Sequence, residues 1–142
     1  MRNKTGVLAK LGVAAAMMVG LTVASQTAAA AAAPTFSVSP ASGLHDGDTV
    51  TVTVTGAGAN EVYGIAQCAN IGASFGCDGS TATTFTTNAS GAATFTLPVH
   101  KTYQAVTHDG VSLGTVDCGT TSCYIGAGNQ NLALGDVVLS FR

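Results

Sequence analysis

Apolar and polar residues alternate along most of the chain after residue 33. The clearest example is the stretch from Thr49 to Thr55, which reads TVTVTVT and puts valines on one face and threonines on the other. A period of two predicts a β-strand with one buried face, and both Val and Thr favour strands. Residues 35–39 alternate in the same way. No apolar stripe of helical period lasts for three turns in this region, so the sequence predicts an all-β domain.

Turn signals rich in Gly, Asn, Asp and Pro separate the other predicted strands. Asn88–Gly91 and Asp109–Gly110 are two such signals. The further strands expected are 62–67, 81–87, 92–97, 102–107, 112–117, 123–125 and 136–141. Short strands at intervals of about ten residues predict an Ig-like antiparallel β-sandwich. The chain has no Trp, so the widely spaced Cys–Trp–Cys pattern of antibody domains is absent.

Residues 1–32 follow the three-part pattern of a secretory signal peptide. Basic residues precede an apolar run from Leu11 to Val23, and an alanine-rich tract, 28–33, comes next. The apolar run is too short for a comfortable membrane span, and no second run of spanning length follows. Several alanines satisfy the cleavage rule. We expect cleavage before Ala33 and a secreted, extracellular domain of residues 33–142.

Loss of the signal peptide changes the charge of the protein. Arg2, Lys4 and Lys10 leave with it, so Lys101 and Arg142 remain against seven acidic residues, a net charge of −5. A protein that binds nucleic acid through its own surface needs clustered Lys and Arg to displace counterions from phosphates. The composition therefore argues against direct binding to DNA and against binding to an anionic membrane.

The four cysteines form two pairs that are close in sequence, Cys68 with Cys77 and Cys118 with Cys123. Extracellular domains permit disulfides, and a bond within each pair would close a small loop. Each loop closure would contribute about 2–3 kcal/mol in the chain-entropy account. Two stapled loops on an apolar scaffold indicate a surface that must keep its shape.

Aromatic and small residues accompany both cysteine pairs. Phe75 lies between Cys68 and Cys77, and Tyr124 is followed by a Gly-Ala-Gly stretch. Phe75 could pack into the core of a tethered hairpin, or it could form the wall of a ligand site. Tyr124 beside bare backbone presents the same two alternatives, since small residues leave room for a bulky group. The pattern alone leaves both open.

Catalytic and metal-binding patterns are missing from the sequence. His45, His100 and His108 fit no zinc or copper spacing, and the cysteines are better used in disulfides. His108 and Asp109 suggest a hydrolase triad, but no Gly-x-Ser-x-Gly elbow is present. Acidic residues lie singly in turns rather than in pairs. We therefore expect neither a metal site nor an enzyme.

Longer motifs carry a family resemblance that covers essentially the whole domain, including all four cysteines at their spacing. The segments are Ala33–Gly43 (APTFSVSPASG), Ile65–Cys68 (IAQC), Thr86–Gly91 (TTNASG), Gly114–Cys118 (GTVDC) and Ile125–Asn129 (IGAGN). They resemble the enediyne antitumour apoproteins of the neocarzinostatin family.

The resemblance implies a seven-stranded Ig-like β-sandwich or barrel with a small β-ribbon subdomain and a cleft between them. The cleft of this family holds a labile enediyne chromophore without a covalent bond. The implied disulfides are Cys68–Cys77 and Cys118–Cys123, both near the cleft. The released chromophore cleaves DNA, so DNA is a partner only through the ligand. A secreted antibiotic carrier protein, monomeric and with no metal, is therefore expected.

Position by position, the resemblance assigns chromophore contacts to twelve residues besides the disulfide. They are Tyr63, Gly64, Gln67, Phe75, Ala82, Val106, His108, Tyr124, Gly126, Ala127, Gly128 and Asn129. The chain departs from relatives by having Gly64 in place of Tyr or Asp. Val106 and His108 occupy positions that are Phe in neocarzinostatin, and Asn70 occupies that of its Trp. These smaller groups predict a roomier or differently shaped cleft.

Two other functions compete with this one. A secreted Ig-like structural or adhesion module without a small ligand predicts a filled cleft. A peptidase predicts an organised serine or histidine, for which the sequence offers no candidate.

Overall fold

The computed structural model describes residues 33–142, and the predicted signal peptide lies outside the described residues. The described chain consists of strands joined by turns and loops. The strands are β1 (Thr35–Ser39), β2 (Thr49–Thr55), β3 (Val62–Ile71), β4 (Ser74–Asp78), β5 (Thr83–Thr86), β6 (Ala93–Pro98), β7 (Thr102–Val106), β8 (Ser112–Asp117), β9 (Cys123–Gly128) and β10 (Ala133–Leu139). Across residues 33–142, no helix is long and apolar enough to cross a membrane.

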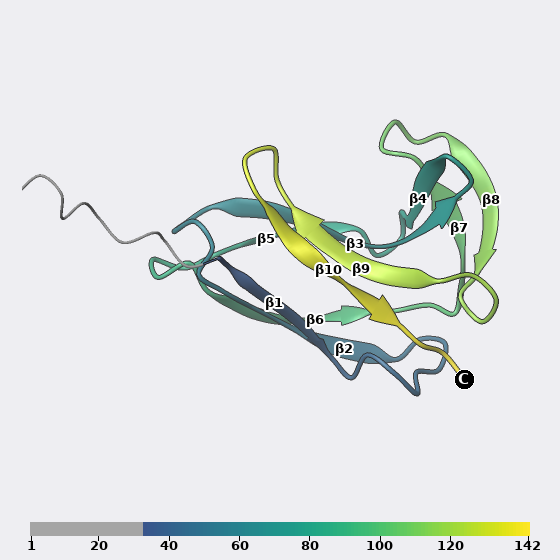
Figure 1. Cartoon of the computed structure of the whole chain (residues 1–142), viewed down its shortest axis with the longest axis horizontal. Helices are drawn as coiled ribbons and strands as arrows, with labels where there is room; N and C mark the ends of the chain where they lie inside the picture. The colour runs from purple at the N-terminus through teal and green to yellow at the C-terminus, as the bar shows by residue number, and fades with distance from the viewer. Residues whose placement is uncertain (1–32) are drawn as a thin grey trace, which may run out of the picture. The chain divides into compact units, whose positions relative to one another are not determined.

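The strands form two antiparallel sheets, which confirms the predicted all-β fold. The smaller sheet has the order β1-β2-β6, and the larger has the order β10-β9-β3-β4-β7-β8 with β5 also paired to β3. Figure 1 shows the three-stranded sheet beneath β3, β9 and β10, while β4, β7 and β8 curl away at one end. The curled end corresponds to the predicted ribbon.

The core between the two layers follows from the alternating pattern. Val50, Val52 and Val54 of β2 are fully buried, and the threonines between them face outward or are only partly covered. These valines belong to one cluster with Tyr63 of β3 and Ile125 of β9. A separate cluster fills the ribbon and consists of Ala69, Tyr103, Ala105, Val116, Cys118 and Cys123.

The largest departure from the predicted strands lies between Cys68 and Cys77. The sequence predicts a loop there, but β3 continues to Ile71 and β4 pairs with it, so that Cys68 lies opposite Cys77. The segment SFGCD has no apolar alternation, and Gly and Asp disfavour strands. Pairing on both sides, with β3 and with β7, overrides this preference. Gly76 is required there, because a Cβ would lie 2.8 Å from Ala105 Cβ.

Candidate ligand-binding cleft

The floor of a cleft is formed by one face of the paired strands β3 and β9. Across these strands Gly64 lies opposite Gly128, Ala66 opposite Gly126, and Cys68 opposite Tyr124. Cross-strand partners in an antiparallel pair project to the same face of the sheet. Because most of these residues have no side chain beyond a methyl group, the face stays hollow above the backbone.

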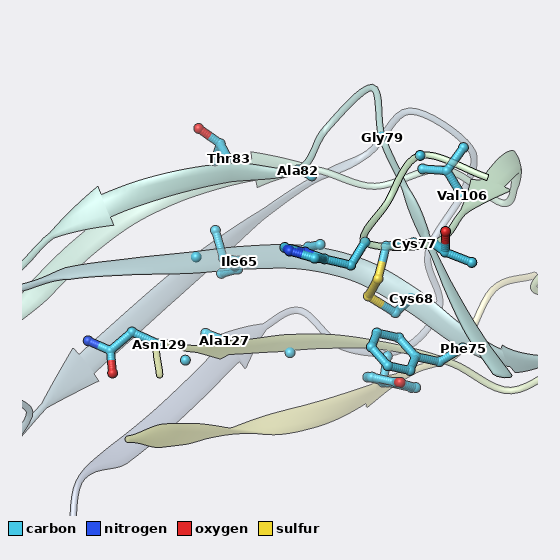
Figure 2. A pocket seen from close by; sticks show the side chains of 18 residues that line it. Ile65, Cys68, Phe75, Cys77, Gly79, Ala82, Thr83, Val106, Ala127 and Asn129 are labelled. Atoms are coloured by element: carbon cyan, nitrogen blue, oxygen red, sulfur yellow. A yellow bond between two sulfur atoms is a disulfide. The ribbon is translucent and has the colours of Figure 1, made fainter. Parts of the chain in front are cut away.

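The walls come from β4, β7 and the loops of the ribbon. Phe75 on β4 is 54% exposed and, in Figure 2, lies beside the Cys68–Cys77 disulfide. Val106 and Ala82 lie in the upper part of Figure 2, on the opposite side of β3 from Phe75 in that view. The cleft has a volume of about 820 Å³, which is within the range of small-molecule sites.

Ten of the twelve residues assigned from the family resemblance line this cleft. They are Gly64, Phe75, Ala82, Val106, His108, Tyr124, Gly126, Ala127, Gly128 and Asn129. Both cysteines of the first disulfide line it as well. The structure thus brings together residues that are up to 65 positions apart in the chain.

Tyr63 and Gln67 do not line the cleft, so their assignment as contact residues disagrees with the structure. Both are 0% exposed. The strand period explains this, because Tyr63 and Gln67 face inward from β3 while Gly64 and Ala66 face the cleft. Tyr63 accepts a hydrogen bond from the Gly58 N–H at 3.0 Å, and Gln67 bonds to the backbone of His100.

Six further residues line the cleft that the resemblance did not assign: Ile65, Ala66, Gly79, Thr83, Thr107 and Gly110. Ala66 could have been found, because it shares a strand face with Gly64 and Cys68. Gly79, Thr107 and Gly110 lie in ribbon loops or at strand ends. Their sequence has no periodic signal, so only the folding of the ribbon over the floor identifies them.

Both predicted disulfides are formed, but only one of them borders the cleft. Cys68–Cys77 links β3 to β4 in the wall. Cys118–Cys123 lies instead in the ribbon core, where Cys123 is fully buried. The second disulfide does not line the cleft, although Cys123 directly precedes the lining residue Tyr124. It stiffens the turn between β8 and β9.

The cleft lining is mainly apolar and carries no carboxylate, lysine or arginine among the described residues. Burial, followed by the charge of Asp136, raises the pKa of the Tyr124 phenol, so the phenol stays neutral over the physiological range. Its hydroxyl donates to Asn70 Oδ1 at 3.4 Å. The Asn129 amide is already bonded to Val62 and to the following turn. These features favour an uncharged ligand held mainly by shape and apolar contact.

Reactive groups do not converge in the cleft. His108 lies at its exposed edge, and no group of three or more His, Cys, Asp or Glu side chains in the described part of the chain could hold a metal ion. A cleft of this kind can bind and shield a small molecule.

The chain is similar over its full length to known apoproteins. The model of the neocarzinostatin family matches residues 36–141. The chain belongs to the neocarzinostatin family. It is 50% identical over 141 residues to the antitumor antibiotic C-1027 apoprotein and to actinoxanthin, both from Streptomyces globisporus. Each alignment covers 99% of this chain and 98% of the relative.

Solved structures of the family share the fold. The structure of macromomycin matches with a TM-score of 0.72 and 40% sequence identity, covering 78% of this chain and all of that one. Membership of the neocarzinostatin family and the Ig-like β architecture, both predicted from sequence motifs, are thus confirmed.

Proposed function

We propose that this protein is a secreted neocarzinostatin-family apoprotein that binds, stabilises and delivers a labile enediyne chromophore without a covalent bond. The observation that carries the proposal is the hollow floor of paired small residues on β3 and β9, closed at the side by Phe75 and a disulfide. Its relatives include a protein named as an antitumor antibiotic apoprotein. Family membership and an open cleft support the same function.

Protection follows from burial in such a cleft. A reactive enediyne survives when water and thiols are kept away and when few easily abstracted hydrogens lie near it. The described residues contain no free cysteine, and the two sulfurs in the wall are tied in a disulfide. A free thiolate at that position would be a nucleophile aimed at the ligand.

The protein acts as a carrier in this proposal, and the chemistry belongs to its ligand. DNA is reached only through the released chromophore, because the exported domain has a net charge of −5 by sequence. The protein works as a monomer outside the cell, with residues 1–32 removed. Mass spectrometry of the exported protein should find Ala33 at its N-terminus.

The open cleft also separates this function from its rivals. An adhesion module without a small ligand would fill the space above Gly64 and Ala66 with side chains, whereas these positions leave a cavity. A peptidase would need a nucleophile beside an oriented base, and no such pair lines the cleft.

Reconstitution tests the proposal directly. The purified apoprotein is mixed with a purified enediyne chromophore, and the half-life of intact chromophore is followed by chromatography with and without protein. We expect a longer half-life and a saturable change in chromophore fluorescence. The same half-life as free chromophore would overturn the proposal. A gel-shift with the apoprotein alone should show no complex with DNA.

A further inference from the structure

A buried carboxylate lies behind one wall of the cleft. Asp78 ends β4 directly after Cys77, and it is the only buried acidic residue among those described, with 2% of its surface exposed. A buried charge persists only where hydrogen bonds or an opposite charge replace its lost water. The partners of Asp78 therefore indicate what its charge holds in place.

The first set of partners belongs to the loop that forms the wall. Asp78 Oδ1 accepts hydrogen bonds from the Ser80 N–H at 2.9 Å and from the Ser80 hydroxyl at 2.6 Å. The Asp78 carbonyl accepts a further bond from the Ala82 N–H at 3.1 Å. Gly79 and Ala82 face the ligand space. Asp78 thus organises this loop from its rear side.

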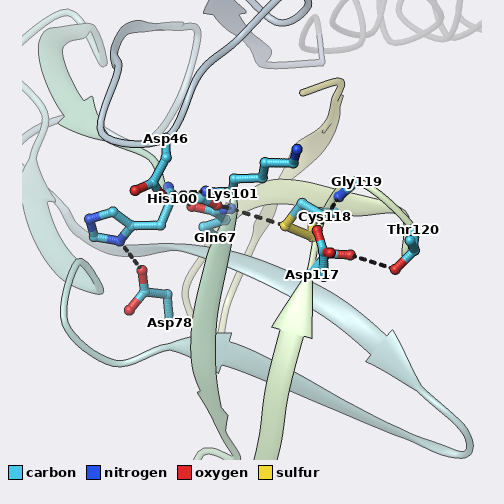
Figure 3. Close-up of a disulfide and its surroundings, with 10 residues drawn as sticks. Asp46, Gln67, Asp78, His100, Lys101, Asp117, Cys118, Gly119 and Thr120 are labelled. Carbon is cyan, nitrogen blue, oxygen red and sulfur yellow. Dashed lines mark hydrogen bonds and ion pairs between the residues drawn. A yellow bond between two sulfur atoms is a disulfide. The ribbon is translucent and has the colours of Figure 1, made fainter. Parts of the chain in front are cut away.

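The second partner connects the loop to the cleft floor. Asp78 Oδ2 lies 2.7 Å from His100 Nδ1, and an ionised carboxylate only accepts, so Nδ1 carries the proton. Gln67 holds the backbone of His100 from both sides, because Oε1 accepts from the N–H at 2.9 Å and Nε2 donates to the carbonyl at 2.6 Å. Figure 3 shows the His100 ring pointing toward Asp78 and the Gln67 amide beside the His100 backbone.

Gln67 stands on β3, the strand whose other face is the cleft floor. A continuous series of hydrogen bonds therefore runs from the floor strand through His100 and Asp78 to the wall. The series lies outside the ligand space itself. It connects the two structural parts whose separation sets the width of the cleft.

We infer that Asp78 is a positioning residue for the cleft: by bonding to Ser80 and His100 it fixes the wall loop 79–82 against β3 and slows the escape of the ligand. This inference rests on the proposed ligand-binding function. A loop that loses its buried anchor opens more often, and a ligand held by shape leaves through such openings.

Other charged and titratable groups face the site from two further segments of the chain, around residue 46 and over residues 100–103. Asp46, His100 and Tyr103 line a second cavity of about 500 Å³ together with Asp78. Asp46 accepts a bond from the backbone N–H of Lys101 at 2.8 Å, and the Lys101 side chain lies near Gly119. Among the described contacts, the carboxylate of Asp78 bonds to Ser80 and His100 and to none of the other groups.

The test compares Asp78→Asn and Ser80→Ala with the wild-type protein. Asp109→Asn is the matched control, because the Asp109 carboxylate is exposed in the same ribbon and bonds to no other described residue. The dissociation rate of a purified enediyne chromophore is measured by fluorescence from pH 7 down to pH 2.5. Amide hydrogen exchange of Thr81 and Ala82 is measured in each ligand-free protein, after circular dichroism has shown that the variant is folded.

We expect Asp78→Asn to release the chromophore about tenfold faster at pH 7, a difference of about 1.4 kcal/mol. Wild-type release should accelerate only below pH 3.8, the ordinary pKa of an aspartate, and the variant should lack that acceleration. In Ser80→Ala the amide hydrogens of Thr81 and Ala82 should exchange faster than in the wild type. This variant should release the ligand at a rate between those of the wild type and Asp78→Asn, so it provides the test if Asp78→Asn does not fold.

Two results would overturn the positioning role. The first is that folded Asp78→Asn and Ser80→Ala both release the chromophore at the wild-type rate. The second is that Asp109→Asn accelerates release as much as Asp78→Asn does. A wild-type protein that binds no enediyne at all would instead overturn the proposed function. In that case the loop exchange still decides whether Asp78 anchors the wall.

Discussion

Gly64 on β3 lies directly opposite Gly128 on β9, and neither residue places a side chain above the cleft floor. The two glycines are nevertheless not equivalent. A Cβ on Gly64 would meet only the Gly128 carbonyl oxygen at 3.7 Å, an ordinary contact. A Cβ on Gly128 would lie 3.1 Å from the backbone of Leu132 and Ala133. One position has free space, and the other is packed against β10.

This difference predicts that the same substitution affects ligand binding at one position and stability at the other. Gly64→Val should fill the floor and weaken chromophore binding about tenfold, while stability is kept because Val favours strands. Gly128→Val should lower the free energy of unfolding by about 1–3 kcal/mol, since the β10 backbone must shift. Titration with chromophore and urea unfolding measure the two effects. Equal stability losses would contradict the described packing.

Two buried tyrosines form a second matched pair. The Tyr103 hydroxyl has no hydrogen-bond partner, and burial raises its pKa far above the ordinary value. Tyr103→Phe should therefore stabilise the protein or leave it unchanged. Tyr63→Phe should cost about 1 kcal/mol, because the Gly58 N–H loses its acceptor. Urea unfolding of both variants checks this, and a clear loss in Tyr103→Phe would point to an unseen partner.

Acid should weaken the folded state through Asp78. Burial, the largest effect, raises its pKa, but bonds from Ser80 and His100 outweigh burial and hold the pKa below 3.8. Because the pKa of Asp78 is lower in the folded than in the unfolded protein, its ionised carboxylate stabilises the folded state at pH values above the unfolded-state pKa. This contribution to the free energy of unfolding is lost as the pH falls through the folded-state pKa.

The free energy of unfolding of the wild type should therefore fall as the pH drops from about 5 to 2. The difference in the free energy of unfolding between the wild type and Asp78→Asn should become smaller over the same pH range. Denaturant titrations at several pH values measure it. A gap that stays constant down to pH 2 would show that the Asp78 charge does not contribute.

The two disulfides should differ in function although they stabilise to a similar extent. Replacing either pair by alanine should cost about 2–3 kcal/mol in unfolding free energy. Loss of Cys68–Cys77 should also raise the chromophore Kd strongly, because that bond borders the cleft. Loss of Cys118–Cys123 should change the Kd less, and the reverse order would contradict the assigned cleft.

Much of the fold follows from local pattern. The alternation of valine and threonine predicts the bounds of β2, because a strand with one solvent-exposed and one buried face has a period of two residues. Longer motifs identify the family and most of the cleft residues. Strand β4 escapes such prediction, since its Gly and Asp are held by pairing with β3 and β7 rather than by propensity.

The sequence by itself determined the β class, the export signal as a prediction, the cysteine pairs and the family. Only the tertiary structure decided which strand face meets the ligand. It turned Tyr63 and Gln67 inward, put Ala66 on the floor, and brought Asp78 to His100. The physical reason is that alternation defines two faces of a strand, whereas the packing of one layer against another decides which face is covered.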